Sequence, residues 1–158
     1  MAFILSDERD ADPVGAFDRY RAYMDREEAR FPARALSLIK SDWYFNPEDH
    51  RCPHDAWLEV ATMREPASGA RHEIRHLTFS IELLGAYHDL RLRLSYPRVF
   101  GYQFLGDAVA QGHSDWRYDE FRVSNNGHLL HEIEWWGHEA TSRWLIEADD
   151  VVFEVETL

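Results

Sequence analysis

From residue 56 onward, hydrophobic and polar residues alternate with a period of two. This period is typical of β-strands that have one buried and one solvent-facing side. The alternation is clearest in residues 76 to 84 and 89 to 96, whose apolar positions are Leu77, Phe79, Ile81, Leu83, Leu90, Leu92, Leu94 and Tyr96. We predict a hairpin here, with Leu83 opposite Leu90 and a loop from Gly85 to His88. This register also sets Glu82 opposite Arg91, a favourable cross-strand pair.

The loop Asn125-Asn126-Gly127 joins two further strands, at residues 116 to 124 and 128 to 136. A three-residue loop with a glycine bulge places the apolar residues of both strands on one face, whereas a two-residue loop mixes apolar and charged residues. The three-residue loop also puts His131 and Asp119 on the apolar face, diagonal to each other. A buried histidine beside a buried aspartate is held as an ion pair or a hydrogen-bonded pair. Additional strands are predicted at residues 56 to 64, 98 to 105, 142 to 147 and 151 to 156.

The amino-terminal residues follow a helical period instead. Asp12 followed by Pro13 is typical of a helix start, and aromatic residues then recur at helical spacing until the helix ends near Arg30. We expect a second helix at residues 33 to 41 and a flexible acidic segment at residues 1 to 11.

Together these elements predict the α+β class, with an N-terminal helix, or two, followed by about eight mostly antiparallel strands that form one curled sheet or two packed sheets. The chain has 158 residues, of which 45% are hydrophobic and 14% aromatic. That is enough apolar material for one stable core, so we expect residues 1 to 158 to form a single domain.

The formal net charge is −12 at pH 7. A negative field repels phosphate backbones and attracts cationic surfaces, so we expect no nucleic-acid partner and favour a basic protein. Charge that serves only solubility is the alternative. Cys52 is the only cysteine, which excludes an intrachain disulfide. The apolar run from Met1 to Leu5 is shorter than a secretory signal requires, and no stretch is apolar enough for a membrane span. We therefore expect a cytoplasmic protein without a membrane partner, and its oligomeric state stays open.

Three histidines stand near acidic residues at predicted loops or strand ends, in His54-Asp55, His88-Asp89 and His113-Ser114-Asp115. Histidine titrates near neutral pH and is a common metal ligand, and a neighbouring carboxylate can orient its ring. If these loops converge at one end of the sheet, the candidate catalytic residues are His54, Asp55, His88, Asp89, His113 and Asp115. The alternative is that each residue caps a turn through backbone hydrogen bonds.

His50, Cys52 and His54 alternate along the chain and would point the same way in an extended segment, as zinc ligands must. They are the candidates for a divalent metal such as zinc, against a surface loop with polar side chains. No other cofactor is predicted, because the motifs of serine hydrolases, P-loop proteins and dinucleotide-binding proteins do not occur in the sequence.

Trp135-Trp136 points one indole to each face of its strand, so one of the two packs against a covering helix or is exposed. An exposed tryptophan among acids and arginines is typical of a protein-binding hot spot. The leading hypothesis is a small acidic interaction or inhibitor-type protein that binds a basic macromolecular partner. A metal-assisted hydrolase or isomerase that uses the loop histidines and aspartates is the alternative, so enzymatic activity stays open. The third hypothesis is a curved sheet that encloses a small ligand.

Overall fold

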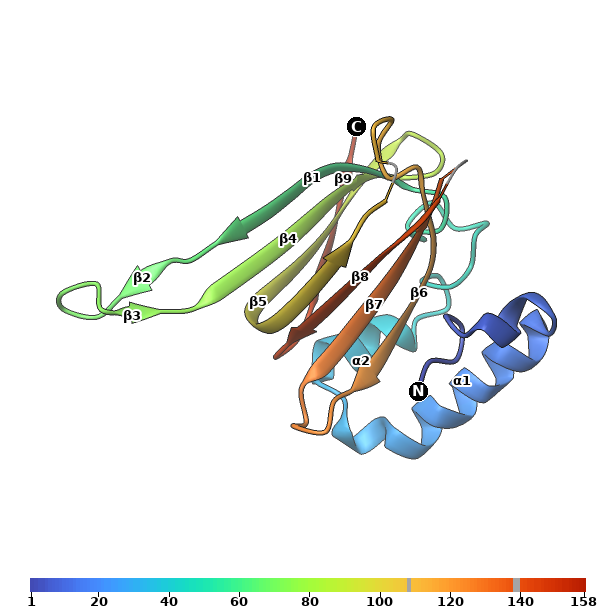
Figure 1. The fold of residues 1–158 in the computed structure, drawn as a ribbon, viewed down its shortest axis with the longest axis horizontal. Helices are drawn as coiled ribbons and strands as arrows, with labels where there is room; N and C mark the ends of the chain where they lie inside the picture. The colour runs from blue at the N-terminus through green and yellow to red at the C-terminus, as the bar shows by residue number, and fades with distance from the viewer. Residues whose placement is uncertain (108, 138–139) are drawn as a thin grey trace.

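Two α-helices and two short 3-10 turns precede the strands in the computed structural model, which describes residues 1–107, 109–137 and 140–158 (Figure 1). They are η1 (Asp7–Asp10), α1 (Pro13–Glu27), η2 (Glu28–Arg30) and α2 (Ala33–Ile39). The Asp12 side chain accepts a hydrogen bond from the backbone N–H of Gly15, and Pro13 occupies a position that needs no N–H donor. The expected helix start is confirmed.

Nine strands follow in the described part of the chain, and every pairing between them is antiparallel. They are β1 (Trp57–Arg64), β2 (Ala67–Ser68), β3 (Ile74–Arg75), β4 (Leu77–Leu84), β5 (Leu90–Leu105), β6 (Asp115–Val123), β7 (Leu129–Trp136), β8 (Thr141–Ala148) and β9 (Val152–Thr157). β2 and β3 form a small sheet at the tip of the arm that β1 and β4 extend away from the body (Figure 1). The other seven strands form one sheet in the order β4-β1-β6-β7-β8-β5-β9. The chain is thus a single α+β domain, and of the two expected arrangements the one curled sheet is present.

The large sheet curls until its two sides meet. β4 pairs along its length with β1 on one side and with β5 on the other. Because β5 also pairs with β8, it connects β4, at one end of the strand order, to the strands near the other end. The circuit closes where β1 meets β6, and there a single residue pair, Trp57 with Asp115, is in register. We call this pairing the seam. From the seam β1 runs out into the arm while β6 continues along the body (Figure 1).

α1 covers the part of β6 that β1 leaves unpaired. The Tyr20 hydroxyl accepts a hydrogen bond from the backbone N–H of Phe121 at 2.8 Å and donates one to the Phe121 carbonyl at 2.9 Å. The Tyr23 hydroxyl accepts a bond from the N–H of Val123. Covering a strand edge in this way protects it from pairing with another chain. The buried core includes Ile81, Leu83, Leu92, Leu94, Trp116, Phe121, Leu129, Ile133 and Trp135.

Residues 1 to 11, which we expected to be a flexible acidic terminus, instead pack on the sheet. Ile4 and Leu5 are buried. The backbone N–H groups of Phe3, Ile4 and Leu5 donate to Oε2 of Glu120 at 2.9, 2.7 and 3.2 Å. The apolar side chains of this segment are buried against the sheet, and the Glu120 carboxylate that binds its backbone lies 115 to 117 positions later in the chain.

β4 and β5 pair two residues away from the predicted register. Glu82 lies opposite Arg93, with which it forms an ion pair at 2.9 Å, and not opposite Arg91. The loop covers residues 86 to 89, one residue later than expected, and His88 turns it with a left-handed φ of 60°. The loop therefore has the predicted length of four residues but begins one residue later, which shifts the register by two residues.

β5 combines two predicted strands, at residues 89 to 96 and 98 to 105. Pro97 lies between them without ending the strand, because β5 changes partner at this point. The ladder with β9 extends to Ser95, and the ladder with β8 begins at Val99. Proline has no backbone N–H donor, so it is tolerated at a strand position whose N–H is not needed for a hydrogen bond to a neighbouring strand.

Candidate functional site

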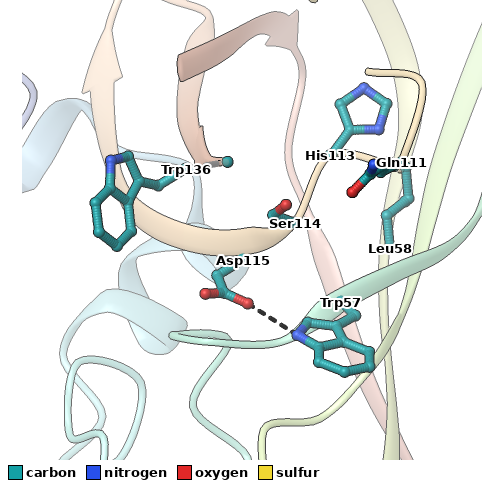
Figure 2. Close-up of a pocket in the computed structure, with 9 residues that line it drawn as sticks. Trp57, Leu58, Gln111, His113, Ser114, Asp115 and Trp136 are labelled. Carbon is teal, nitrogen blue, oxygen red and sulfur yellow. Dashed lines mark hydrogen bonds between the residues drawn. The ribbon is translucent and has the colours of Figure 1, made fainter. Parts of the chain in front are cut away.

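The seam brings three side chains into one row across three neighbouring strands. Trp57 on β1 is in register with Asp115 on β6, and Asp115 is in register with Trp136 on β7. The Trp57 indole donates a hydrogen bond from Nε1 to Oδ1 of Asp115 at 2.8 Å. Figure 2 shows the carboxylate between the two indoles. Trp57 is 50% exposed and Trp136 is 54% exposed, so two large apolar surfaces face solvent beside a carboxylate.

A pocket of about 380 Å³ opens at this row, and we call it the seam pocket (Figure 2). It is lined by Trp57, Leu58, Gln111, Gly112, His113, Ser114, Asp115, Trp136 and Gly137. Burial lowers the pKa of His113 below 6.5, which favours its neutral ring, and Asp115 is the acidic side chain among the described lining residues. Oδ2 of Asp115 accepts no hydrogen bond from any described residue, so it can receive one from a ligand.

Left-handed backbone conformations surround the seam. They occur at Asp55, His88 and Ser114, with φ angles of 63°, 60° and 60°. Such angles are uncommon for residues with a Cβ and persist where the surrounding contacts impose them. The Asp55 N–H donates to the carbonyl of Trp116 at 2.9 Å, Ser114 turns the chain into β6, and the His88 ring contacts Trp57 at a centroid distance of 5.0 Å. These turns hold the ends of β1 and β6 together at the seam.

Arg117 approaches the row from outside the seam pocket. Its guanidinium carbon lies 5.2 Å from the centre of the Trp136 ring, and its Nη1 lies 3.7 Å from Oδ1 of Asp55. The positive charge therefore lies near the Asp55 carboxylate, which also contacts His54. The contact also shows that the Trp136 ring accepts a guanidinium.

His131 belongs to a buried network that is separate from the seam pocket. Its Nε2 lies 2.9 Å from Oδ2 of Asp119, and its Nδ1 lies 2.6 Å from the hydroxyl of Tyr96. Asp119 also accepts hydrogen bonds from the hydroxyl of Tyr44 at 2.8 Å and from Nε1 of Trp116 at 3.1 Å. The predicted pairing of His131 with Asp119 on the buried face is confirmed. Because core donors occupy both oxygens of Asp119, this network holds the core together.

The predicted catalytic residues fall into two groups. His113 and Asp115 line the seam pocket, and His88 reaches its edge through Trp57. His54 instead lines a second pocket, of about 180 Å³, and its Nδ1 lies 2.5 Å from the carbonyl of Arg117. Asp55 stays beside its histidine, with Oδ1 at 3.5 Å from Nε2 of His54 and 3.7 Å from Nη1 of Arg117, whereas Asp89 pairs with His50.

His50, Cys52 and His54 lie in a series of turns and not in an extended strand, and only Cys52 and His54 line the same pocket. Nδ1 of His50 lies 2.6 Å from Oδ2 of Asp89, and its ring stacks on Tyr87. Cys52 is buried, and burial raises the pKa of its thiol to about 12. Within residues 1–107, 109–137 and 140–158, no group of three or more His, Cys, Asp and Glu side chains is arranged to hold a metal ion.

Trp57 is not among the candidate residues that the sequence identifies, and Trp136 is anticipated only as one member of the Trp135-Trp136 pair. A signal for Trp136 exists, because two adjacent tryptophans in a strand face opposite sides, and Trp135 is fully buried while Trp136 is exposed. No local pattern places Trp57 beside Asp115, which lies 58 positions later.

No protein-family model, curated protein or solved structure matches the chain. In the part of the chain that the structure describes, no helix has the length and apolar character needed to cross a membrane.

Proposed function

We propose that this chain is an interaction protein of the inhibitor type that binds a basic partner protein at the seam pocket. The observation that carries the proposal is the row of Trp57, Asp115 and Trp136, in which two half-exposed indoles stand on either side of a carboxylate. Tryptophan often dominates protein interfaces because it combines a large apolar area with a polar N–H. The carboxylate gives the pocket a preference for positive charge.

The charge of the whole chain supports the same class of partner. A net charge of −12 attracts a basic surface over a distance and speeds the encounter. The seam pocket then supplies short-range recognition, in which a buried interface tryptophan typically contributes about 2 kcal/mol or more. A lone cysteine suits a reducing compartment, so we place this encounter in the cytoplasm and expect neither nucleic acid nor membrane lipid as the partner.

The other two functions have less support. A metal-assisted hydrolase or isomerase would need its histidines to converge, and His54 lies in a different pocket from His113. A ligand enclosed by the curled sheet would have to displace the core, because buried side chains such as Trp116 and Trp135 fill the interior.

The test is affinity purification from the source cells at low and at high salt, with the full chain and with a Trp57→Ala/Trp136→Ala variant. The double variant keeps the net charge, so it separates the pocket from general electrostatic attraction. We expect a basic protein that is recovered at low salt, released at high salt and not retained by the variant. Tyr102→Ala, which removes an aromatic side chain of 52% exposure from β5, should retain the partner as the wild type does. Equal retention by the double variant, a partner that is not basic, or no partner contradicts the proposal.

A further inference from the structure

We infer that the seam pocket takes a single arginine side chain of the partner, with its guanidinium between Trp57 and Trp136 and paired with Asp115. This inference rests on the proposed function and names the chemistry that the site recognises. The spacing of the indoles and the oxygens that line the pocket favour a guanidinium over the ammonium of lysine, and the charge of the pocket favours a cation.

The spacing of the two indoles fits one flat group. Trp57 and Trp136 are in register with Asp115 from opposite sides, so their backbones are two strand spacings apart. Two spacings amount to about 9.6 Å. A planar group in van der Waals contact with a ring on each side needs about 7 to 8 Å between the two rings. Because Trp57 is held by its hydrogen bond to Asp115, we expect a rotation of the Trp136 side chain to cover the difference, so that a guanidinium contacts both indoles at once.

The oxygens of the seam pocket suit a planar donor. The Trp57 Nε1 holds Oδ1 of Asp115 at 2.8 Å, which orients the carboxylate before binding and leaves Oδ2 for an incoming N–H group. Gln111 and Ser114 line the same pocket and offer an amide oxygen and a hydroxyl oxygen (Figure 2). A guanidinium carries five N–H donors in one plane and no acceptor, so it can bond to the carboxylate and to a second oxygen together. An ammonium is compact and strongly hydrated, and it cannot stack.

The surface of this chain already uses the same contact at other positions. Guanidinium groups lie over aromatic rings in the pairs Arg9–Tyr118 at 4.5 Å, Arg51–Trp43 at 4.7 Å and Arg117–Trp136 at 5.2 Å. Arginine contacts with aromatic rings are attractive because the ring face is electron-rich. Trp57 and Trp136 line a pocket beside a carboxylate, and the described lining residues include no lysine or arginine.

The test compares two short peptides that differ at one position, arginine or lysine, in an otherwise neutral sequence. Isothermal titration with the full chain gives the two dissociation constants. Because lysine loses the stacking and the planar hydrogen bonds, we expect the arginine peptide to bind about tenfold more tightly. Free arginine amide should bind more weakly than the arginine peptide, because we infer that the pocket recognises arginine as a side chain within a polypeptide. Equal or tighter binding of arginine amide overturns the assignment to a partner's side chain.

Variants show whether the preference arises in the seam pocket. Asp115→Asn and Trp136→Ala should each remove most of the preference for arginine. Asp25→Asn makes the same change of charge at an exposed position of α1 and should leave both affinities unchanged. Far-UV circular dichroism verifies that each variant is folded. Equal affinity for the two peptides, or full affinity for arginine in Asp115→Asn, overturns the inference. Either outcome leaves the proposed binding of a basic partner standing, because the affinity purification that tests it does not depend on which cation enters the pocket.

Discussion

Replacing Asp119 with asparagine tests whether the buried network stabilises the fold. The carboxylate accepts from Tyr44 at 2.8 Å and His131 at 2.9 Å on Oδ2, and from Trp116 at 3.1 Å on Oδ1. The amide oxygen of asparagine can replace only one of these oxygens, so its NH₂ group meets at least one core donor. One orphaned buried donor costs about 1 to 3 kcal/mol. The two remaining bonds lose their charge assistance, at about 1 kcal/mol each.

We therefore expect Asp119→Asn to lower the free energy of unfolding by about 3 to 5 kcal/mol. With a urea m-value of about 2 kcal/mol per molar, a loss of about 3 kcal/mol moves the denaturation midpoint by about 1.5 M. Tryptophan fluorescence in a urea titration measures the change. Asp18→Asn is the matched control, because the Asp18 side chain is 60% exposed beside Arg21, and such pairs contribute less than about 1 kcal/mol. A loss in Asp119→Asn no larger than in the control would refute this reasoning.

Three further predictions concern titratable groups. Burial raises the pKa of Glu120 above 4.5, so its contribution to stability is largest at low pH and falls as pH rises from 4.5 through the folded pKa. Urea denaturation should show the wild type losing stability relative to Glu120→Gln over that range, and the opposite slope would contradict this. The His113 ring should titrate in NMR spectra with a midpoint below 6.5, because burial lowers its pKa, and a higher midpoint would argue against a neutral ring. Burial raises the pKa of Cys52 to about 12, so a thiol reagent at neutral pH should react far faster in urea than with the folded chain, whereas equal rates would count against it.

The sequence predicted the face of each strand better than the register between strands. At Asn125-Asn126-Gly127 the two possible loops differ by an odd shift, which exchanges the faces, so the hydrophobic pattern could choose between them. Phe121 lies opposite His131, and Gly127 has the φ of 80° that the glycine bulge requires. At the hairpin of β4 and β5 the error is two residues, with Leu83 opposite Leu92. An even shift leaves every side chain on the same face, so the pattern could not detect it.

The candidate site depends on contacts between distant parts of the chain. Asp115 and His113 are found from the sequence because each stands in a recognisable group of polar residues. Trp57 joins them only because the sheet curls far enough for β1 to meet β6 at one residue pair. The amino-terminal segment shows the same limit, since Glu120 receives its three N–H groups from residues 115 to 117 positions earlier. Local periodicity contains no information on such pairings.

The most direct test of the seam pocket is an NMR titration that follows the indole N–H signals while the arginine peptide is added. The signals of Trp57 and Trp136 should shift together and saturate, because their rings bracket the bound guanidinium. The signals of the buried Trp116 and Trp135 should move little. Shifts confined to other tryptophans, or no shift at concentrations where the peptide binds, would show that the basic group is recognised elsewhere on the protein.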